Sequence, residues 1–360
     1  MKKFISAIVV LLFMLFITAC GNSTSTNENS SEGDSGSTET EKQEEKYELT
    51  VSHGFPETAF VHKFVEWFDE EVQKRSDGRL SFNIYPNGQL LPVSQEVAGL
   101  LDGQVDMVQS TSPVLTGIDP IWNFYDLPFI FNYDVNEPLV HLENMTKFNL
   151  HENGGKYIEK QMEEKGIKVL GMVYNDYFGS IFTADKDKIV TDLASAKGLK
   201  VRTPGGIITP ETLKQLGSSG MTIAGAEAIT ALQQGVVDGT LTTPMFAFDT
   251  SLPVETYTVA PIFTSVVPLL ISVNKFNSLP QDLQEILLEV KEDYPHHAQQ
   301  VVYESYVEKL KQMEERGIEI YYPTDEEIAE MKEATQPVWE FYEKEVDGGT
   351  QLIEALKSME

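Results

Sequence analysis

Metal and catalytic chemistry find little support among the residues of this sequence. The six histidines include no pair four residues apart beside a glutamate, the arrangement of a helical zinc site. Glycine-rich phosphate loops, the dinucleotide-binding turn and the Gly-x-Ser-x-Gly nucleophile turn are also absent from the sequence. Most of the 56 aspartates and glutamates are expected to be solvated surface. We therefore predict no metal, no cofactor and no catalytic residue.

One arginine has a position typical of an anion-binding residue. A short predicted strand over residues 199–202 ends at Arg202, and the turn Gly205-Gly206 and a helix from about Pro210 follow. Ligands of open α/β lobes lie outside such strand ends. A guanidinium donates two parallel hydrogen bonds to a carboxylate and keeps its charge where water is excluded. On spacing alone, however, a structural ion pair with a neighbouring acid explains Arg202 better.

Strands and helices alternate along most of the chain, which indicates an α/β fold with largely parallel sheets. Helices are predicted at 60–72 and 94–102, and strands at 47–51, 80–85, 105–108, 166–174, 199–202 and 239–241. Long amphipathic helices follow at 281–313, with an irregularity near Pro295, at 325–344 and at 350–358. The pattern predicts two lobes and a helical C-terminal segment.

The N-terminus predicts export and a lipid anchor. Lys2 and Lys3 precede an apolar run, and residues 1–19 have the form of a signal peptide and not of a membrane span. Small residues then lead to Cys20, the only cysteine, in a way that resembles the bacterial lipobox, where the thiol is acylated. The alternative is an ordinary secretory signal with an incidental cysteine. We expect Cys20 to hold the protein at the outer face of the cytoplasmic membrane.

Composition separates a tether from the folded part. Residues 20–46 are rich in Ser, Thr, Asn, Gly and Glu, which predicts a flexible tether, so the fold starts near Tyr47. The net charge of −29 makes nucleic acid and anionic lipid headgroups poor partners. It does not exclude a small anionic ligand, because one or two cations can dominate a cleft locally.

Several short motifs occur in an order that resembles the DctP-type solute receptors of tripartite ATP-independent periplasmic (TRAP) transporters. Besides the strand that ends at Arg202, they are Asn87-Gly88-Gln89-Leu90 and the runs 100–106, 126–131 and 231–239. The resemblance covers essentially all of the chain after the tether. It implies that Arg202 forms the principal salt bridge to a ligand carboxylate, and it favours ligand contact over a structural role for Arg202.

The resemblance also implies the architecture. We expect a two-lobed, periplasmic-binding-protein-like α/β fold with an interlobe cleft and long C-terminal helices. Lobe I would hold residues 47–174 plus about 263–305. Lobe II would hold about 175–262 plus 306–360, so that the chain crosses between the lobes several times.

Two departures from the family pattern bear on the ligand. Many members carry a second carboxylate-binding arginine where this chain has Gly179. Many also place Asn-Pro where this chain has Thr243-Pro244, which offers a hydroxyl in place of the amide. These changes favour a monocarboxylate, including a hydroxy or keto acid, over a dicarboxylate or sialic acid.

Further contacts are expected at strand ends and near the lobe boundary. His53 and Thr111 are candidate polar contacts in lobe I, although a histidine satisfied at a strand end explains His53 equally well. Tyr177, Phe178 and Phe246 could wall the cleft, although packing in the core explains them better, and Thr243 could supply a hydroxyl. Trp122, Phe124 and Tyr125 are expected in the core.

The predicted function is an extracytoplasmic receptor that binds a small organic carboxylate and delivers it to a TRAP permease with a small and a large membrane subunit. A binding protein that feeds a membrane sensor is the alternative. A surface hydrolase or lyase is the less favoured third hypothesis.

Overall fold

The computed structural model describes residues 45–134 and 136–359. The predicted signal peptide, Cys20 and nearly all of the tether lie outside the described residues. Within the described part of the chain, no helix combines the length and the apolar character needed to cross a membrane.

The first sheet has five strands in the order β2-β1-β3-β10-β4. β1, β2 and β3 are parallel, whereas β10 runs antiparallel to both β3 and β4. The bounds are β1 Tyr47–His53, β2 Leu80–Tyr85, β3 Met107–Gln109, β4 Ile167–Tyr174 and β10 Val266–Ser272.

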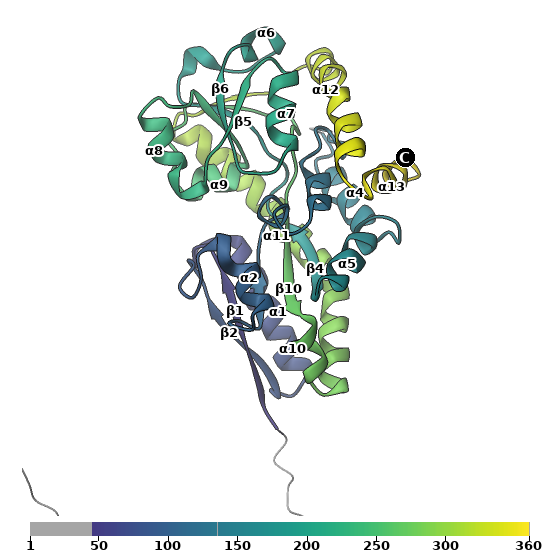
Figure 1. Cartoon of the computed structure of the whole chain (residues 1–360). Helices are drawn as coiled ribbons and strands as arrows, with labels where there is room; N and C mark the ends of the chain where they lie inside the picture. The colour runs from purple at the N-terminus through teal and green to yellow at the C-terminus, as the bar shows by residue number, and fades with distance from the viewer. Residues whose placement is uncertain (1–44, 135, 360) are drawn as a thin grey trace, which may run out of the picture. The chain divides into compact units, whose positions relative to one another are not determined.

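The second sheet has six strands in the order β11-β9-β5-β8-β6-β7, and Figure 1 shows β5 and β6 apart from β1, β2 and β10. β6 is parallel to β7 and β8, and β5 is antiparallel to β8 and β9. The bounds are β5 Ser180–Thr183, β6 Lys200–Thr203, β7 Ser219–Thr222, β8 Gly239–Thr242, β9 Thr256–Thr258 and β11 Glu319–Tyr321.

Both sheets are mixed, so the expectation of largely parallel sheets is wrong. The chain leaves the first sheet after β4, enters the second at β5, and returns between β9 and β10. Because β5 and β10 arrive from the other sheet without a crossover helix beside their new neighbours, they are free to pair antiparallel. The lobe boundaries given above remain predictions.

Helices cover both sheets, and Trp122, Phe124 and Tyr125 are fully buried, as predicted. The α-helices are α1 Phe60–Arg75, α2 Glu96–Leu101, α3 Ser112–Leu115, α4 Leu139–Leu150, α5 Gly155–Glu164, α6 Leu193–Ala196, α7 Ile208–Gln215, α8 Ala228–Gln233, α9 Pro244–Asp249, α10 Val273–Ser278, α11 Gln281–Glu315, α12 Asp325–Glu345 and α13 Gly349–Lys357. The 3₁₀ turns are η1 Val93–Gln95, η2 Pro120–Asp126, η3 Lys186–Lys188 and η4 Gly225–Glu227.

The long helix α11 contacts elements of both sheets. It packs on β4 and α1 beside the first sheet, and on α9 and β11 beside the second (Figure 1). Its Tyr294 lies so close to Gly171 of β4 that a Cβ at Gly171 would stand 2.6 Å from the tyrosine ring. A glycine at this position therefore lets α11 approach the sheet closely.

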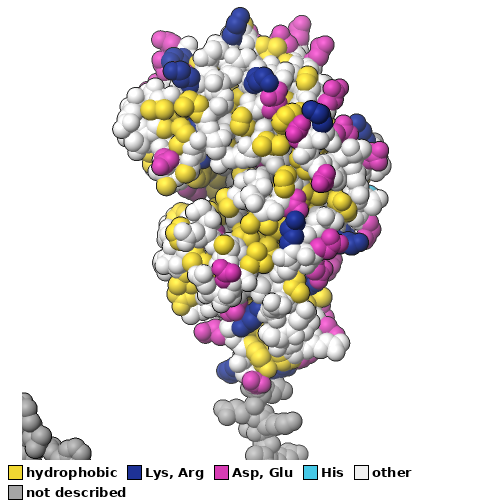
Figure 2. Space-filling model, viewed as in Figure 1, with side chains coloured by type: hydrophobic (Ala, Val, Ile, Leu, Met, Phe, Trp, Pro, Cys, Tyr) yellow, Lys and Arg dark blue, Asp and Glu magenta, His cyan; other side chains and the backbone are white. Residues whose placement is uncertain are grey.

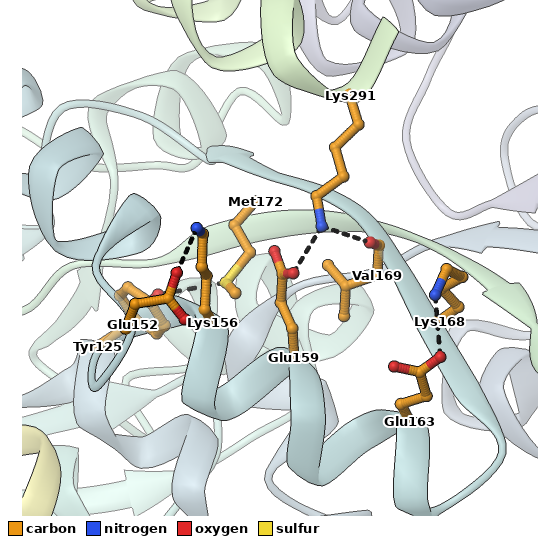
Figure 3. Close-up of polar contacts among 9 residues, drawn as sticks. All are labelled: Tyr125, Glu152, Lys156, Glu159, Glu163, Lys168, Val169, Met172 and Lys291. Carbon is orange, nitrogen blue, oxygen red and sulfur yellow. Dashed lines mark hydrogen bonds and ion pairs between the residues drawn. The ribbon is translucent and has the colours of Figure 1, made fainter. Parts of the chain in front are cut away.

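A partly buried ion pair fastens α11 to the first sheet (Figure 3). Lys291 Nζ lies 2.5 Å from Glu159 Oε2 on α5 and 3.2 Å from the backbone oxygen of Val169 on β4. Burial raises the pKa of Glu159, and the attraction of Lys291 opposes that rise. Lys291, Glu159 and Pro295 line a small cavity at this point. The pair thus joins three elements through one ammonium group.

We expect Lys291→Met to lower the free energy of unfolding by about 1–3 kcal/mol, because Glu159 is then left without its cation. The loss should grow as pH rises through the raised folded-state pKa of Glu159, since the unpaired carboxylate is the destabilised form. Urea denaturation followed by circular dichroism at several pH values measures it.

The exposed pair Lys311–Glu315, also on α11, provides the matched control, and Lys311→Met should change stability by less than about 0.5 kcal/mol. Lys291→Met combined with Glu159→Gln should recover part of the loss. Equal effects of Lys291→Met and Lys311→Met would contradict a bracing role for Lys291.

Candidate functional site

Arg202 lies in β6, inside the second sheet, between β7 and β8. It is only 3% exposed. Its Nε donates a hydrogen bond of 2.8 Å to the backbone oxygen of Ile223, which follows β7. Its guanidinium lies over the ring of Phe246 on α9, with 5.9 Å between the guanidinium carbon and the ring centroid. These contacts fix one edge and one face of the guanidinium, and the terminal amino groups donate no hydrogen bond to any described residue.

The Arg202 guanidinium has no acidic partner in the described part of the chain. Burial lowers its pKa to about 10, so the group is charged at neutral pH. The structural ion pair that spacing alone favours is therefore not formed among the described residues. Keeping a buried cation without a counter-ion costs several kcal/mol, and such groups are normally paired. The arrangement is that of a receptor for an anionic group.

The start of α9 places Phe246 beside Arg202. Thr243 caps the helix, because its hydroxyl accepts a bond of 3.4 Å from the Phe246 amide. The buried carboxylate of Asp176 accepts from the amides of Met245, at 2.6 Å, and Tyr177, at 2.7 Å. Burial raises the pKa of Asp176 to about 7. The structure thus brings Arg202 and Phe246 into contact and gives the Thr243 hydroxyl a capping bond.

In the described part of the chain, His53 and Thr111 form no hydrogen bond, ion pair or ring contact with Arg202. His53 is fully buried, and its Nε2 lies 3.0 Å from Nδ1 of His62. Its Nδ1 accepts from the Phe55 amide at 3.2 Å, so both ring nitrogens are engaged. Burial lowers the pKa of His53 to about 4, so the ring is neutral. Thr111 is partly exposed and precedes α3, where its side chain makes no capping bond.

Tyr177 and Phe178 lie in a buried aromatic cluster between β4 and β5. Tyr177 stacks on Tyr306 of α11 with 4.3 Å between centroids, and Phe178 meets Tyr133 edge to face at 4.8 Å. The Tyr177 hydroxyl is buried and has no hydrogen-bond partner among the described residues. No ring contact links these two residues to Phe246 in the described part. Their role as cleft walls remains a prediction.

A phenylalanine fills the space beside Gly179, where the resemblance described above implies an arginine in many relatives. A Cβ at Gly179 would stand 1.6 Å from a ring carbon of Phe263, which is itself buried. The backbones are also joined, because the Gly179 amide donates to the Phe263 oxygen at 2.7 Å. No side chain fits at position 179 unless that ring moves. The sequence alone shows the glycine at position 179 but not the Phe263 ring that lies against it.

We expect Gly179→Ala to lower the free energy of unfolding by about 1–3 kcal/mol, because the added methyl group overpacks a filled site. Thermal denaturation measures the effect. Gly117→Ala is the control, because its Cβ would meet nothing nearer than 3.6 Å. A Gly179→Ala protein as stable as the parent would mean that the Phe263 ring leaves room for a larger side chain.

Comparison with known proteins identifies the family of this chain. The family model for the bacterial extracellular solute-binding protein, family 7 (DctP), matches residues 51–345. The chain therefore belongs to the DctP family and is an extracytoplasmic solute-binding protein, not an enzyme. This confirms the class that the motif order predicts and excludes the hydrolase or lyase hypothesis.

Among curated relatives, the 2,3-diketo-L-gulonate-binding periplasmic protein YiaO of Escherichia coli K12 is 23% identical, over 84% of this chain and 89% of its own length. The C4-dicarboxylate-binding periplasmic protein DctP of Rhodobacter capsulatus is 26% identical, over 81% of this chain and 84% of its own length.

Solved structures share the two-lobed α/β fold. A TRAP periplasmic solute-binding protein from Haemophilus influenzae RdAW with bound L-gulonate has a TM-score of 0.78 at 21% identity, over 87% of this chain and 99% of its own. One from Desulfovibrio salexigens with bound orotic acid has a TM-score of 0.79 at 21% identity, over 87% of this chain and 98% of its own. These neighbours confirm the predicted fold class.

Proposed function

We propose that this protein captures a small organic monocarboxylate and delivers it to the membrane subunits of a TRAP permease. The observation that carries the proposal is the buried, charged Arg202 guanidinium without a counter-ion in the described chain. A ligand carboxylate would supply that counter-ion and accept hydrogen bonds from the free amino groups. Gulonate, orotate and succinate, bound by three structural neighbours, all carry a carboxylate.

Access from solvent is consistent with this role. Figure 2 shows a hollow in the surface between the part that carries α8 and α9 in Figure 1 and the part that carries α2. Acidic side chains are dispersed over the same view and do not gather in one patch. On this face the acidic charge is thus spread out, where salt screens it, so the charge of Arg202 can act locally.

Restriction to one carboxylate is supported by the surroundings of Gly179. A dicarboxylate would gain from a second guanidinium, and Phe263 occupies the space that such a side chain would need. Thr243, which stands in place of the family's asparagine, uses its hydroxyl to cap α9. The second end of the ligand would therefore meet neutral groups.

We expect Arg202→Ala to weaken binding by on the order of 3–5 kcal/mol, because the ligand anion loses its partner in a dry site. That is roughly a hundredfold to several-thousandfold in affinity. Arg202→Lys should restore only part, since an ammonium lacks the two-pronged geometry. Calorimetry with the acid that co-purifies with the protein, identified by mass spectrometry, tests this.

Arg316→Ala is the matched control, because the exposed Arg316 also lies over a phenylalanine ring, 3.5 Å from the centroid of Phe248. It should leave affinity unchanged. Near-parental affinity in folded Arg202→Ala protein would overturn the assignment of a carboxylate ligand.

The lipid anchor at Cys20 is also part of the proposal. It rests on the apolar run and the small residues before the only cysteine. Each acyl methylene buried in a bilayer contributes roughly 0.8 kcal/mol, so two or more chains would hold the receptor at the membrane.

Cys20→Ser should release the protein from membranes and leave ligand affinity unchanged, because tether and binding site are separate parts of the chain. Fractionation after a high-salt wash, with calorimetry on both forms, measures the outcome. Membrane-bound Cys20→Ser protein would show that something other than an acylated cysteine holds it.

A further inference from the structure

Strand register places a row of side chains beside Arg202 on one face of the second sheet. Arg202 of β6 pairs with Thr240 of β8, Thr240 pairs with Phe182 of β5, and Phe182 pairs with Tyr257 of β9. Directly paired residues project to the same face of a sheet. The Phe182 and Tyr257 rings stack with 4.4 Å between centroids, as that placement requires. Ser180, two residues before Phe182, lies on the same face.

Two hydroxyl groups on this face are buried and unpartnered. Thr240 and Ser180 are both 0% exposed, and neither hydroxyl has a hydrogen-bond partner among the described residues, whereas the Tyr257 hydroxyl interacts with Tyr306 of α11. Buried polar side chains are normally hydrogen-bonded, so two exceptions on one face call for an explanation. Thr240 is the nearer of the two to Arg202 along the sheet, on the adjacent strand.

On the opposite face of the same sheet, buried threonine hydroxyls have hydrogen-bond partners. Thr203 follows Arg202 on β6, and its hydroxyl lies 3.1 Å from that of Thr222 on β7. Thr183 follows Phe182, and its hydroxyl lies 2.6 Å from that of Thr256 on β9. These far-face threonine hydroxyls are therefore hydrogen-bonded, whereas those of Thr240 and Ser180, on the face of the Arg202 guanidinium, are not.

We propose that Thr240, with Ser180 behind it, recognises a hydroxyl group on the ligand's carbon chain close to the carboxylate that Arg202 holds. Adjacent strands are about 4.8 Å apart, so one small molecule can meet both residues. A threonine hydroxyl both donates and accepts, which suits an alcohol group. The ligand class is then a hydroxylated monocarboxylate. This inference rests on the proposed function, since it needs the carboxylate at Arg202.

The role of Thr240 is tested by measuring, by calorimetry, the affinities of paired acids that differ by one hydroxyl group. The pairs are lactate and propionate, 3-hydroxybutyrate and butyrate, and gluconate and 2-deoxygluconate. The parent protein should prefer at least one hydroxylated acid over its deoxy partner. Thr240→Val, which keeps the shape and removes the hydroxyl, should reduce that preference about tenfold. Thr240→Ser keeps the hydroxyl and should retain the preference. Thr203→Val, a change on the far face, should also retain it.

Two results would overturn the inference. One is a parent protein that prefers no hydroxylated acid; the other is a Thr240→Val protein with the parent's preference, as expected if only water meets the hydroxyl. Arg202→Ala separates these failures from failure of the proposed function. Lost binding in Arg202→Ala beside unchanged preference in Thr240→Val removes only the role of Thr240. Unchanged binding in Arg202→Ala removes the carboxylate and with it this inference.

Discussion

The physical constraint on which the rest of this structure depends is the buried positive charge of Arg202. A guanidinium in the interior of a sheet is normally paired with a carboxylate of the same protein, and the described chain supplies none. Instead, a backbone oxygen holds Nε and the Phe246 ring lies against one face. Both contacts orient the cation without neutralising it. The uncompensated charge makes the folded state less stable than a paired one would be, and the carboxylate of the proposed ligand would recover that deficit as binding energy.

The crossings of the chain between its two sheets shape the surroundings of that charge. The β4 to β5 crossing carries Asp176, which helps to cap α9, and Gly179, which lies under Phe263. Phe263 itself belongs to the returning segment between β9 and β10. These two crossing segments together leave no room for a larger side chain at Gly179. Under the proposed function, the number of cations that meet the ligand is therefore set by how the connections pack.

Much of the architecture could be predicted from sequence, because it depends on local pattern. The periodicity of residues 281–313 predicted the long helix α11, and motif order predicted the family. The antiparallel strand β10 was missed, since Val266–Ser272 contains Pro268, and a proline inside an apolar run argues against a strand. Thr240 was missed for a different reason. Its proposed role depends on which residues lie beside it on the neighbouring strands β6 and β5, and strand register is a tertiary property. The bond between His53 and His62 likewise depends on how α1 docks.

Pro295 gives α11 an uneven stiffness along its length. A proline has no amide hydrogen, so the carbonyl of Lys291, one turn earlier, receives no helical bond from it. The side chain of the same Lys291 is fastened to Glu159 and Val169. The helix is thus clamped to the first sheet at the turn where its own backbone ladder is interrupted. The interrupted turn is where α11 bends most easily, and it lies on the first-sheet side of a helix that also packs on α9 and β11 beside the second sheet.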